Sequence, residues 1–250
     1  MSELEPHKPG RRLDKHFRWR GTEVSRVEAI ADAVFGLVLA MLLLNEHTPD
    51  SFSGMFVAVK ALIPFGVTFA FIAMVWFEHY LFFRRYDLHD GPSIALTFVL
   101  LFLVLGFAYP LKLLFTTLTI VFLGPIGELG LTKSPGEQSD LGPAFLVYSC
   151  GYLLIFSTIA LLYRIALGRR AALDLDACEL FLTRSAIASS LVHVAVASLS
   201  LLLTRYSLWR GPECPVLEYG IPGWIYCLLG PLMGVHGSWE GRRLRQLGAA

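Results

Sequence analysis

The chain has 250 residues, of which 55% are hydrophobic and only 16% are charged, and its mean hydropathy is +0.58. This balance excludes a soluble globular domain, which needs far more polar surface. The formal net charge of +1 gives no reason to expect a nucleic-acid partner. We therefore expect an all-α, polytopic membrane protein.

The first 25 residues are charged and contain few apolar positions. Six basic residues lie in this stretch: Lys8, Arg11, Arg12, Lys15, Arg18 and Arg20. Such a tail either lies on anionic headgroups or stays solvated and sets the topology of the chain. We favour the solvated tail. We expect no secretory signal, because the first apolar run begins late and lacks a clear cleavage site.

Six apolar segments follow, each near the roughly 20 residues that a helix needs to cross a bilayer. Their approximate bounds are 27–44, 55–83, 92–123, 143–167, 181–203 and 221–238. The second segment contains Pro64 and the third contains Pro110. Because the third segment is overlong, we expect it to tilt or to break after its proline. The stretch 204–220 shows no obvious helix and is predicted to be a loop.

The basic residues separate according to the side of the membrane. Of the 21 Lys and Arg residues, 16 lie in the N-terminal part through Arg26, in the second–third loop, around the fourth–fifth connection and in the C-terminal tail. An excess of Lys and Arg marks the cytoplasmic side. Both termini are therefore predicted to be cytoplasmic, in agreement with an even number of spans. The predicted parts are a basic cytoplasmic tail (1–25), a six-span transmembrane domain (26–240) and a second basic cytoplasmic tail (241–250).

The first span begins with two carboxylates, Glu28 and Asp32. A carboxylate at membrane depth is costly, so it usually faces protein or water. At helical spacing, Leu37, Met41 and Leu44 form one bulky apolar stripe. Small residues form a second stripe beside it, of the kind that lets membrane helices approach closely. We expect the carboxylates to face the chain's own other helices, which leaves the bulky stripe free either for ordinary packing or for another partner.

Polar residues of the second span are predicted to lie at the same depth as these carboxylates. Trp76 and His79 are one helical turn apart, toward the cytoplasmic end of the span. We expect Arg26, Asp32, Trp76 and His79 to form a polar network that braces the first span. A contact of Asp32 with Arg26 or His79 would offset the cost of burying the carboxylate. A direct ion or proton site is the alternative.

No enzyme motif, phosphate-binding loop or dinucleotide fingerprint stands out, so we expect no enzymatic activity and no cofactor. The four cysteines, Cys150, Cys178, Cys214 and Cys227, show no metal-binding spacing, and we expect no metal site. A TVGYG potassium filter is also missing. His193 in the fifth span is either a proton relay or, as we favour, part of an interhelical hydrogen bond.

Residues 24–115 resemble the transmembrane protein 175 family of endolysosomal and bacterial potassium channels. The resemblance rests on three features: R-x-E-A-x-x-D-x-V-F in the first span, W-x-x-H at Trp76 and His79, and the proline late in the third span at Pro110. The last three spans match the family in pattern only. The first-span motif is fairly specific, because an acid so placed in an apolar helix is rare.

The first span also departs from the family pattern, R-x-x-x-F-S-D-G. Arg26 and Asp32 are kept, whereas Ile30, Ala31 and Ala33 replace the Phe, Ser and Gly of the pattern. The missing Ser hydroxyl removes one polar partner from the helix-bracing network that the resemblance implies.

The resemblance implies that six-span units assemble as tetramers, with the first span of each subunit lining the pore. Rings of bulky apolar side chains form the constriction in the family, and counting from Asp32 places them at Leu37, Met41 and Leu44. The predicted function is a homotetrameric, potassium-permeable cation channel of the bacterial inner membrane. Its partners are potassium ions, the lipid bilayer and further copies of the chain. A hydrophobic constriction can also act as a gate.

Two other classes of function remain open. A proton-coupled carrier would use Asp32, His79 or His193, whereas a membrane scaffold would transport nothing. Channel and carrier differ in whether potassium flux through the purified protein in liposomes follows the voltage without proton exchange.

Overall fold

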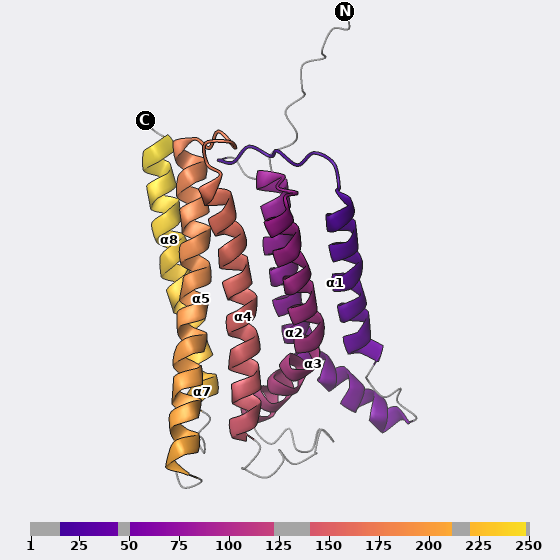
Figure 1. The fold of residues 1–250 in the computed structure, drawn as a ribbon. Helices are drawn as coiled ribbons and strands as arrows, with labels where there is room; N and C mark the ends of the chain where they lie inside the picture. The colour runs from indigo at the N-terminus through magenta and orange to yellow at the C-terminus, as the bar shows by residue number, and fades with distance from the viewer. Residues whose placement is uncertain (1–15, 45–50, 123–140, 212–220, 249–250) are drawn as a thin grey trace, which may run out of the picture.

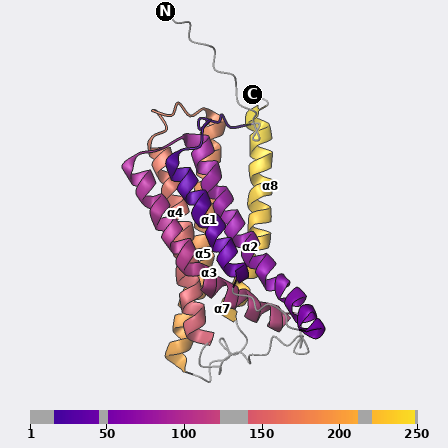
Figure 2. The same ribbon diagram turned by 90° about the vertical axis from the view of Figure 1, so that its right-hand side faces the viewer.

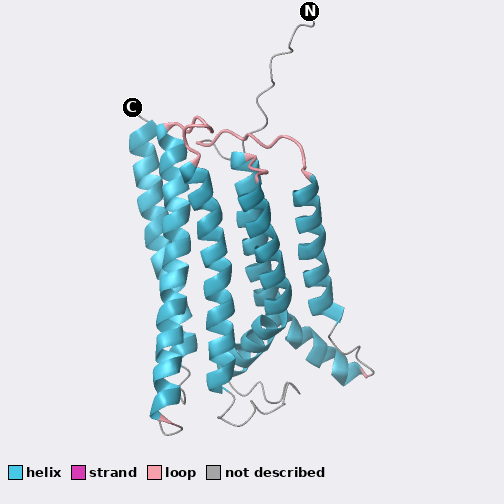
Figure 3. Ribbon diagram, viewed as in Figure 1, coloured by secondary structure: helices cyan, strands magenta, loops and turns pink. Residues whose placement is uncertain are grey.

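The computed structural model describes residues 16–44, 51–122, 141–211 and 221–248, and every regular element within these ranges is a helix (Figure 3). The elements in order are α1 (Arg26–Leu44), α2 (Phe52–Tyr86), α3 (Gly91–Phe122), α4 (Leu141–Gly168), α5 (Ala177–Arg210), α7 (Ile221–Trp224), the 3-10 turn η3 (Ile225–Leu228) and α8 (Leu229–Gly248). The all-α prediction is confirmed for this part of the chain.

The long helices run side by side and alternate in direction along the chain (Figures 1 and 2). Helix α1 lies at one edge, where it contacts α2 and α3, and α3 connects this group to α4. Helix α4 packs on α5, and α5 packs on α8 at the opposite edge. The beginning of α1 and the end of α8 lie at the same end of the bundle.

Four helical stretches of the described chain are long and apolar enough to cross a membrane: Leu62–Tyr86, Gly91–Lys112, Gly142–Gly168 and Ala177–Arg210. The multi-span prediction is therefore confirmed for four of the six segments. Helix α1 has 19 residues, which corresponds to about 28 Å at a rise of ~1.5 Å per residue. Helix α8 is more polar, because it contains Glu240, Arg242, Arg243 and Arg245.

Two prolines bend helices without ending them. Helix α3 continues through Pro110 to Phe122, so the predicted break does not occur, but its last turns run aside from the bundle axis (Figures 1 and 2). The first turns of α2, before Pro64, diverge at the same end of the molecule. A proline lacks the N–H for the helical hydrogen bond and its ring pushes against the preceding turn, which accounts for such bends.

Helix α5 is longer at both ends than the predicted span 181–203. It begins at Ala177 and ends at Arg210, so part of the predicted loop 204–220 is helical. The hydroxyls of Thr204 and Ser207 donate to carbonyls four residues earlier, at 2.9 and 2.8 Å. Both hydroxyl groups are thus hydrogen-bonded within the helix, so these polar residues do not end it.

Residues 16–25 form an ordered strap across one end of the bundle, seen in indigo above the helices in Figure 1. The Phe17 side chain is fully buried and packs edge-on against Tyr86 at 5.4 Å between ring centroids. The guanidinium of Arg85 lies 5.0 Å from the centre of the Phe17 ring. The prediction of a solvated tail is therefore wrong for residues 16–25, because Phe17 anchors the strap in the core. Residues 1–15 lie outside the described chain.

The strap backbone lies directly on the last turn of α2. The N–H groups of Arg20 and Gly21 donate to the Arg84 carbonyl at 3.0 and 3.2 Å. A Cβ atom at Gly21 would lie only 2.6 Å from the Phe83 carbonyl oxygen. This close approach requires glycine at position 21.

Candidate functional site

Helix α1 has one buried face and one exposed face. Ala31, Phe35, Val38 and Leu42 are at most 2% exposed and pack into the core. The exposed positions follow at helical spacing on the other side, and all but Asp32 are apolar: Ala29, Ile30, Asp32, Ala33, Gly36, Leu37, Ala40 and Leu43. Because α1 lies at the edge of the bundle, this largely apolar face is not covered by the described part of the chain.

The three predicted constriction residues differ in their surroundings. Leu37 is 54% exposed and belongs to the open face. Met41 is half-buried at the border of that face. Leu44 ends α1, and its side chain lies outside the described residues. Leu39, on the other side of the helix, is half-buried and packs against the core.

The structure brings two of the four predicted network residues into direct contact. The Trp76 indole N–H donates to Asp32 Oδ1 at 2.7 Å and thus ties α1 to α2. His79 is 3% exposed and lies between the rings of Phe35 and Phe83, at 6.1 and 4.9 Å. Its Nε2 atom has no hydrogen-bond partner among the described residues. The expected bond from Asp32 to His79 is therefore absent from this part of the chain.

Arg26 lies apart from this group. Its side chain is exposed, and within the described residues it forms no ion pair with Asp32. The carboxylate that does pair is Glu28, whose Oε2 atom accepts from Arg84 Nη2 at 2.6 Å. Both side chains of this pair are less than 10% exposed. A buried pair of this kind is costly to break, since the remaining charge would be left without a partner.

Glu28 also caps α1. Its carboxylate accepts from the Ser25 N–H at 2.9 Å, and the Ser25 hydroxyl accepts from the Glu28 N–H at 3.2 Å. This is the reciprocal capping box of an S-x-x-E sequence, a signal that sequence reasoning missed. Arg84 was not predicted as the partner: it lies 56 residues away in the chain, and no sequence motif connects the two residues.

The other end of α1 is held by a side chain of α3. Lys112 Nζ donates to the Leu42 carbonyl at 3.1 Å. A cation at the C-terminus of a helix satisfies a free carbonyl and complements the helix dipole. Helix α1 is thus fixed near both of its ends, and between them Asp32 ties its exposed side to α2 through Trp76.

A second buried acid, Glu179, joins the strap to α5. Its side chain is fully buried, and it accepts from Arg18 Nη2 at 3.2 Å and Arg20 Nη2 at 2.8 Å. The hydrogen bond to Glu179 raises the pKa of the Arg18 guanidinium above its ordinary value. Arg20 also donates to the Leu173 carbonyl at 2.9 Å. Sequence reasoning missed Glu179, although the D-x-x-E at Asp176 is a capping signal that the structure uses.

The candidate proton sites do not form one group. His193 Nδ1 lies 2.9 Å from the Ser189 carbonyl of its own helix, and its ring stacks on Phe156 of α4 at 4.1 Å. Among the described residues, the expected interhelical hydrogen bond of His193 is not formed, and its contact with α4 is ring stacking. Asp32 and His79 lie instead between α1 and α2. In the described ranges, no group of three His, Cys, Asp or Glu residues is arranged to hold a metal ion.

These features define the class of protein: a multi-span helical membrane protein whose edge helix presents an open apolar face. A sequence model of the endosomal/lysosomal potassium channel TMEM175 matches residues 26–107. A protein of Marivirga tractuosa named potassium channel is 34% identical over 239 residues, which cover 94% of this chain and 95% of that protein. A crystal structure of a variant of the potassium channel MtTMEM175, bound to a nanobody fusion, has a TM-score of 0.76 at 32% identity. That similarity covers 92% of this chain and 99% of the other.

The chain belongs to the TMEM175 family of potassium channels. The similarity covers nearly the whole chain, and thus extends beyond residues 24–115, where the sequence motifs lie.

Proposed function

We propose that this chain forms a potassium-permeable channel in which four copies place the exposed face of α1 around a central pore. The observation that carries the proposal is the position of α1 at the edge of the bundle (Figure 1), together with the largely apolar face that it leaves exposed. Small residues on that face, such as Gly36 and Ala40, allow helices of neighbouring subunits to approach closely. Membership in a potassium-channel family favours a pore over simple packing.

All six apolar segments cross the bilayer in this proposal, including α1 and α8. Their charged residues gather at the end of the bundle where the strap lies, with Glu28 paired to Arg84. The basic side chains of α8, Arg242, Arg243 and Arg245, lie in its last turns at that same end. By the charge rule this end is cytoplasmic, which gives cytoplasmic termini in a bacterial inner membrane.

The constriction consists of rings of Leu37, Met41 and Leu44. When four α1 helices meet on an axis, these side chains follow one another at steps of about 5–6 Å. A ring of leucines repels water, so ions pass only when the ring is wide enough to stay wet. The flexible thioether of Met41 changes the width of its ring, and the constriction thereby also acts as the gate.

The polar network acts as a brace in this proposal and does not bind the ion. The bond between Asp32 and Trp76 fixes the rotation of α1 against α2, and this rotation decides which side chains face the axis. Arg26, which is exposed, remains part of the proposed brace, whereas His79 supports it from inside the subunit, between the rings of Phe35 and Phe83. Asp32→Asn is expected to lower the yield of tetramer more than it changes ion selectivity. Normal assembly with an inverted ion preference would instead place Asp32 in the ion pathway.

The decisive test is a planar-bilayer recording of the purified protein with potassium and sodium on opposite sides. Leu37→Asn and Met41→Asn are expected to raise the conductance and to weaken the discrimination between the two ions, because they widen and wet the constriction. Leu39→Asn is the matched control, since Leu39 packs against the core. The tetramer content of each variant is measured first. Unchanged currents in Leu37→Asn and Met41→Asn with intact assembly would contradict the pore assignment.

The same protein in liposomes distinguishes a channel from a carrier. Potassium flux that follows the voltage without proton exchange supports the channel. Flux that requires a proton gradient and is lost in Asp32→Asn would indicate a carrier. The absence of any flux would indicate a non-transporting scaffold.

The topology is tested by labelling single cysteines from outside whole cells, in a background without native cysteines. Positions Thr48, Lys133 and Glu213 are expected to react, whereas positions Gly10 and Arg170 are not. Labelling of the second pair in place of the first would reverse the orientation.

A further inference from the structure

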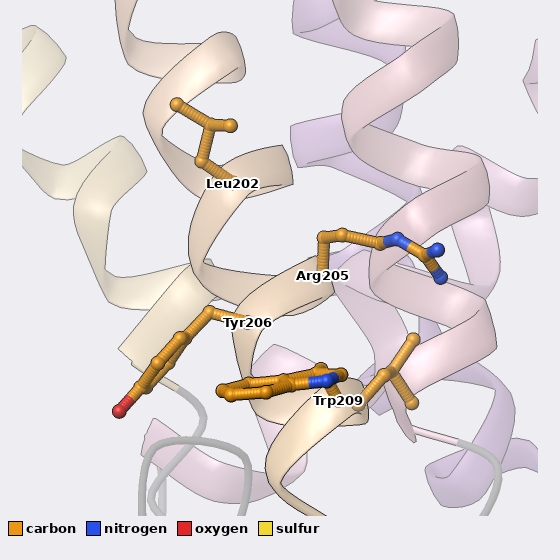
Figure 4. Close-up of a pocket in the computed structure, with 5 residues that line it drawn as sticks. Leu202, Arg205, Tyr206 and Trp209 are labelled. Carbon is orange, nitrogen blue, oxygen red and sulfur yellow. The ribbon is translucent and has the colours of Figure 1, made fainter.

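The end of α5 that lies opposite the strap presents a hollow lined by residues of unlike chemistry. Its volume is about 410 Å³, and the lining consists of Leu202, Arg205, Tyr206, Leu208 and Trp209. Figure 4 shows Arg205 and Tyr206 extending in opposite directions, with the Trp209 ring between them. Trp209 is 78% exposed and Leu202 is 67% exposed, so a large apolar surface is left open beside a positive charge.

Arg205 is the cationic member of this hollow. Its side chain is exposed, and the described part of the chain offers it no hydrogen bond or ion pair. This distinguishes Arg205 from the buried or partly buried arginines of the strap end, such as Arg20 and Arg84, whose carboxylate partners lie within the bundle. The ligand that complements Arg205 is therefore an anion, and the open aromatic and aliphatic surface beside it requires an apolar part in the same ligand.

The depth of the hollow fits the boundary between lipid headgroups and hydrocarbon. Arg205 lies about 39 Å along α5 from the buried Glu179, at ~1.5 Å per residue. Because the hydrocarbon core of a bilayer is ~30 Å thick, the two charges lie in opposite headgroup regions when α5 spans. Tyr and Trp gather at this depth, where their rings meet both water and lipid. Tyr206 and Trp209 are the residues expected there.

An exposed apolar stripe leads from the hollow toward the middle of the membrane. Leu202, Leu199, Ala195 and Leu191 follow at steps of three or four residues, and all four are exposed. This spacing places them on one face of α5. The stripe is continuous with the hollow and provides a track for an acyl chain below a headgroup held at Arg205.

We propose that this end of α5 is a binding site for one anionic phospholipid, whose phosphate pairs with Arg205. Its glycerol region packs on Trp209 and Leu208, and an acyl chain follows the stripe from Leu202 to Leu191. The site needs only that α5 crosses the bilayer, so the proposal does not depend on potassium permeation.

The test is native mass spectrometry of the full-length protein after its lipids have been exchanged for detergent. Phosphatidylglycerol and phosphatidylcholine with the same acyl chains are titrated separately. The wild-type chain is expected to bind phosphatidylglycerol more tightly. Arg205→Gln should weaken phosphatidylglycerol binding about fivefold, the equivalent of about 1 kcal/mol for one basic residue at an anionic membrane surface, and leave phosphatidylcholine binding unchanged.

Three further variants sharpen the test. Arg210→Gln is the matched control, because Arg210 is exposed at the same end of α5 but does not line the hollow. It should leave the preference between the two lipids intact. Trp209→Ala should weaken both lipids equally, since it removes apolar contact only. Arg205→Lys retains the positive charge and should keep the preference. Arg205→Ala replaces Arg205→Gln if that variant yields no folded protein.

Several outcomes would overturn the proposal. These are equal binding of the two lipids by the wild type, an equal loss in Arg210→Gln, or a loss of subunit assembly in Trp209→Ala, which would make the hollow a contact between copies of the chain. Because binding is measured without any ion current, a negative result here leaves the channel proposal untouched, and a failed channel assay leaves the lipid site standing.

Discussion

The two ends of the bundle contain the same kinds of residue in opposite circumstances. At the strap end, the aromatic ring of Phe17 is fully buried and Arg20 pairs with a buried Glu179. At the opposite end, Trp209 is 78% exposed and Arg205 has no partner within the described chain. Aromatic and basic residues thus stabilise the fold where the chain itself supplies their partners, and they remain exposed where the described chain does not.

This difference has a consequence for α1. The strap end fixes the beginning of α1 through Ser25, Glu28 and Arg84, in contact with α2 and the strap. Near its opposite end, α1 is tied to α3 by the bond from Lys112 to the Leu42 carbonyl, and no buried ion pair is found there among the described residues. We therefore expect stability to depend chiefly on the strap end, and the exposed face of α1 to adjust more freely toward its other end. The following variants test that expectation.

The largest loss of stability is expected when the buried ion pair between Glu28 and Arg84 is broken. Arg84→Met leaves Glu28 without its cation and removes two bonds from Arg84 to the strap, to the Gly21 and Glu23 carbonyls at 2.9 and 3.3 Å. Breaking one partner of a buried pair costs about 3–5 kcal/mol. Denaturant unfolding in detergent measures the loss, with Arg170→Met as the control because Arg170 is exposed at the same end. Equal stability of the two variants would mean that the pair is dispensable.

The next largest loss of stability is expected for Phe17→Ala, which is compared with Trp209→Ala at the other end of the bundle. Phe17→Ala is expected to lower the free energy of unfolding by about 3 kcal/mol, because it empties a buried site. Trp209→Ala should change it by less than about 0.5 kcal/mol, as is usual for an exposed side chain. The same unfolding assay measures both. The comparison of the two ends fails if Trp209→Ala proves to be the more damaging of the two.

A smaller loss of stability is expected when Glu179, the buried acid that binds the strap, loses its charge. Glu179→Gln keeps the size of the side chain but weakens the charged hydrogen bonds from Arg18 and Arg20, which should cost about 2 kcal/mol. The strap should then open more often and be cut faster by trypsin after these arginines. Asp174→Asn is the matched control, because the Asp174 side chain is 94% exposed and lies 3.7 Å from Arg18, a geometry that contributes little. Faster cleavage in both variants would contradict the role of Glu179.

The sequence was sufficient for the features that depend on neighbouring residues. The apolar runs predicted the helices, and the motif around Asp32 identified the family, which the comparisons confirmed. The prediction failed where polar residues continue a helix. Thr204 and Ser207 were assigned to a loop, although their hydroxyls donate to carbonyls of their own helix. Likewise, the basic residues around Phe17 suggested a solvated tail, although the Phe17 side chain is buried in the core.

Most contacts between distant parts of the chain were beyond the sequence, although Asp32 and Trp76 were predicted to share a network. Glu28 and Arg84 are 56 residues apart, and Arg20 and Glu179 are 159 residues apart. Nothing in the spacing of these residues indicates which acid meets which base. Asp32 was expected to contact Arg26 or His79, yet the contact with Trp76 forms instead. Capping boxes and helix faces can be identified from the sequence alone. The partners of buried charged residues depend on how the helices pack.

The smallest effect concerns the backbone contact between the strap and α2. Gly21→Ala places a methyl group 2.6 Å from the Phe83 carbonyl oxygen, which is backbone and cannot turn aside. The strap must therefore lift slightly, and the bonds from Arg20 and Gly21 to the Arg84 carbonyl lengthen; we expect a loss of about 1–2 kcal/mol. Gly168→Ala is the control at the same end, since a Cβ atom there would meet nothing within 4 Å. Unfolding measurements should show Gly168→Ala unchanged or slightly stabilised, because alanine is the better helix former. If Gly21→Ala were equally harmless, the strap would be a loose cover, and the contrast between the two ends would rest on Phe17 and the ion pairs alone.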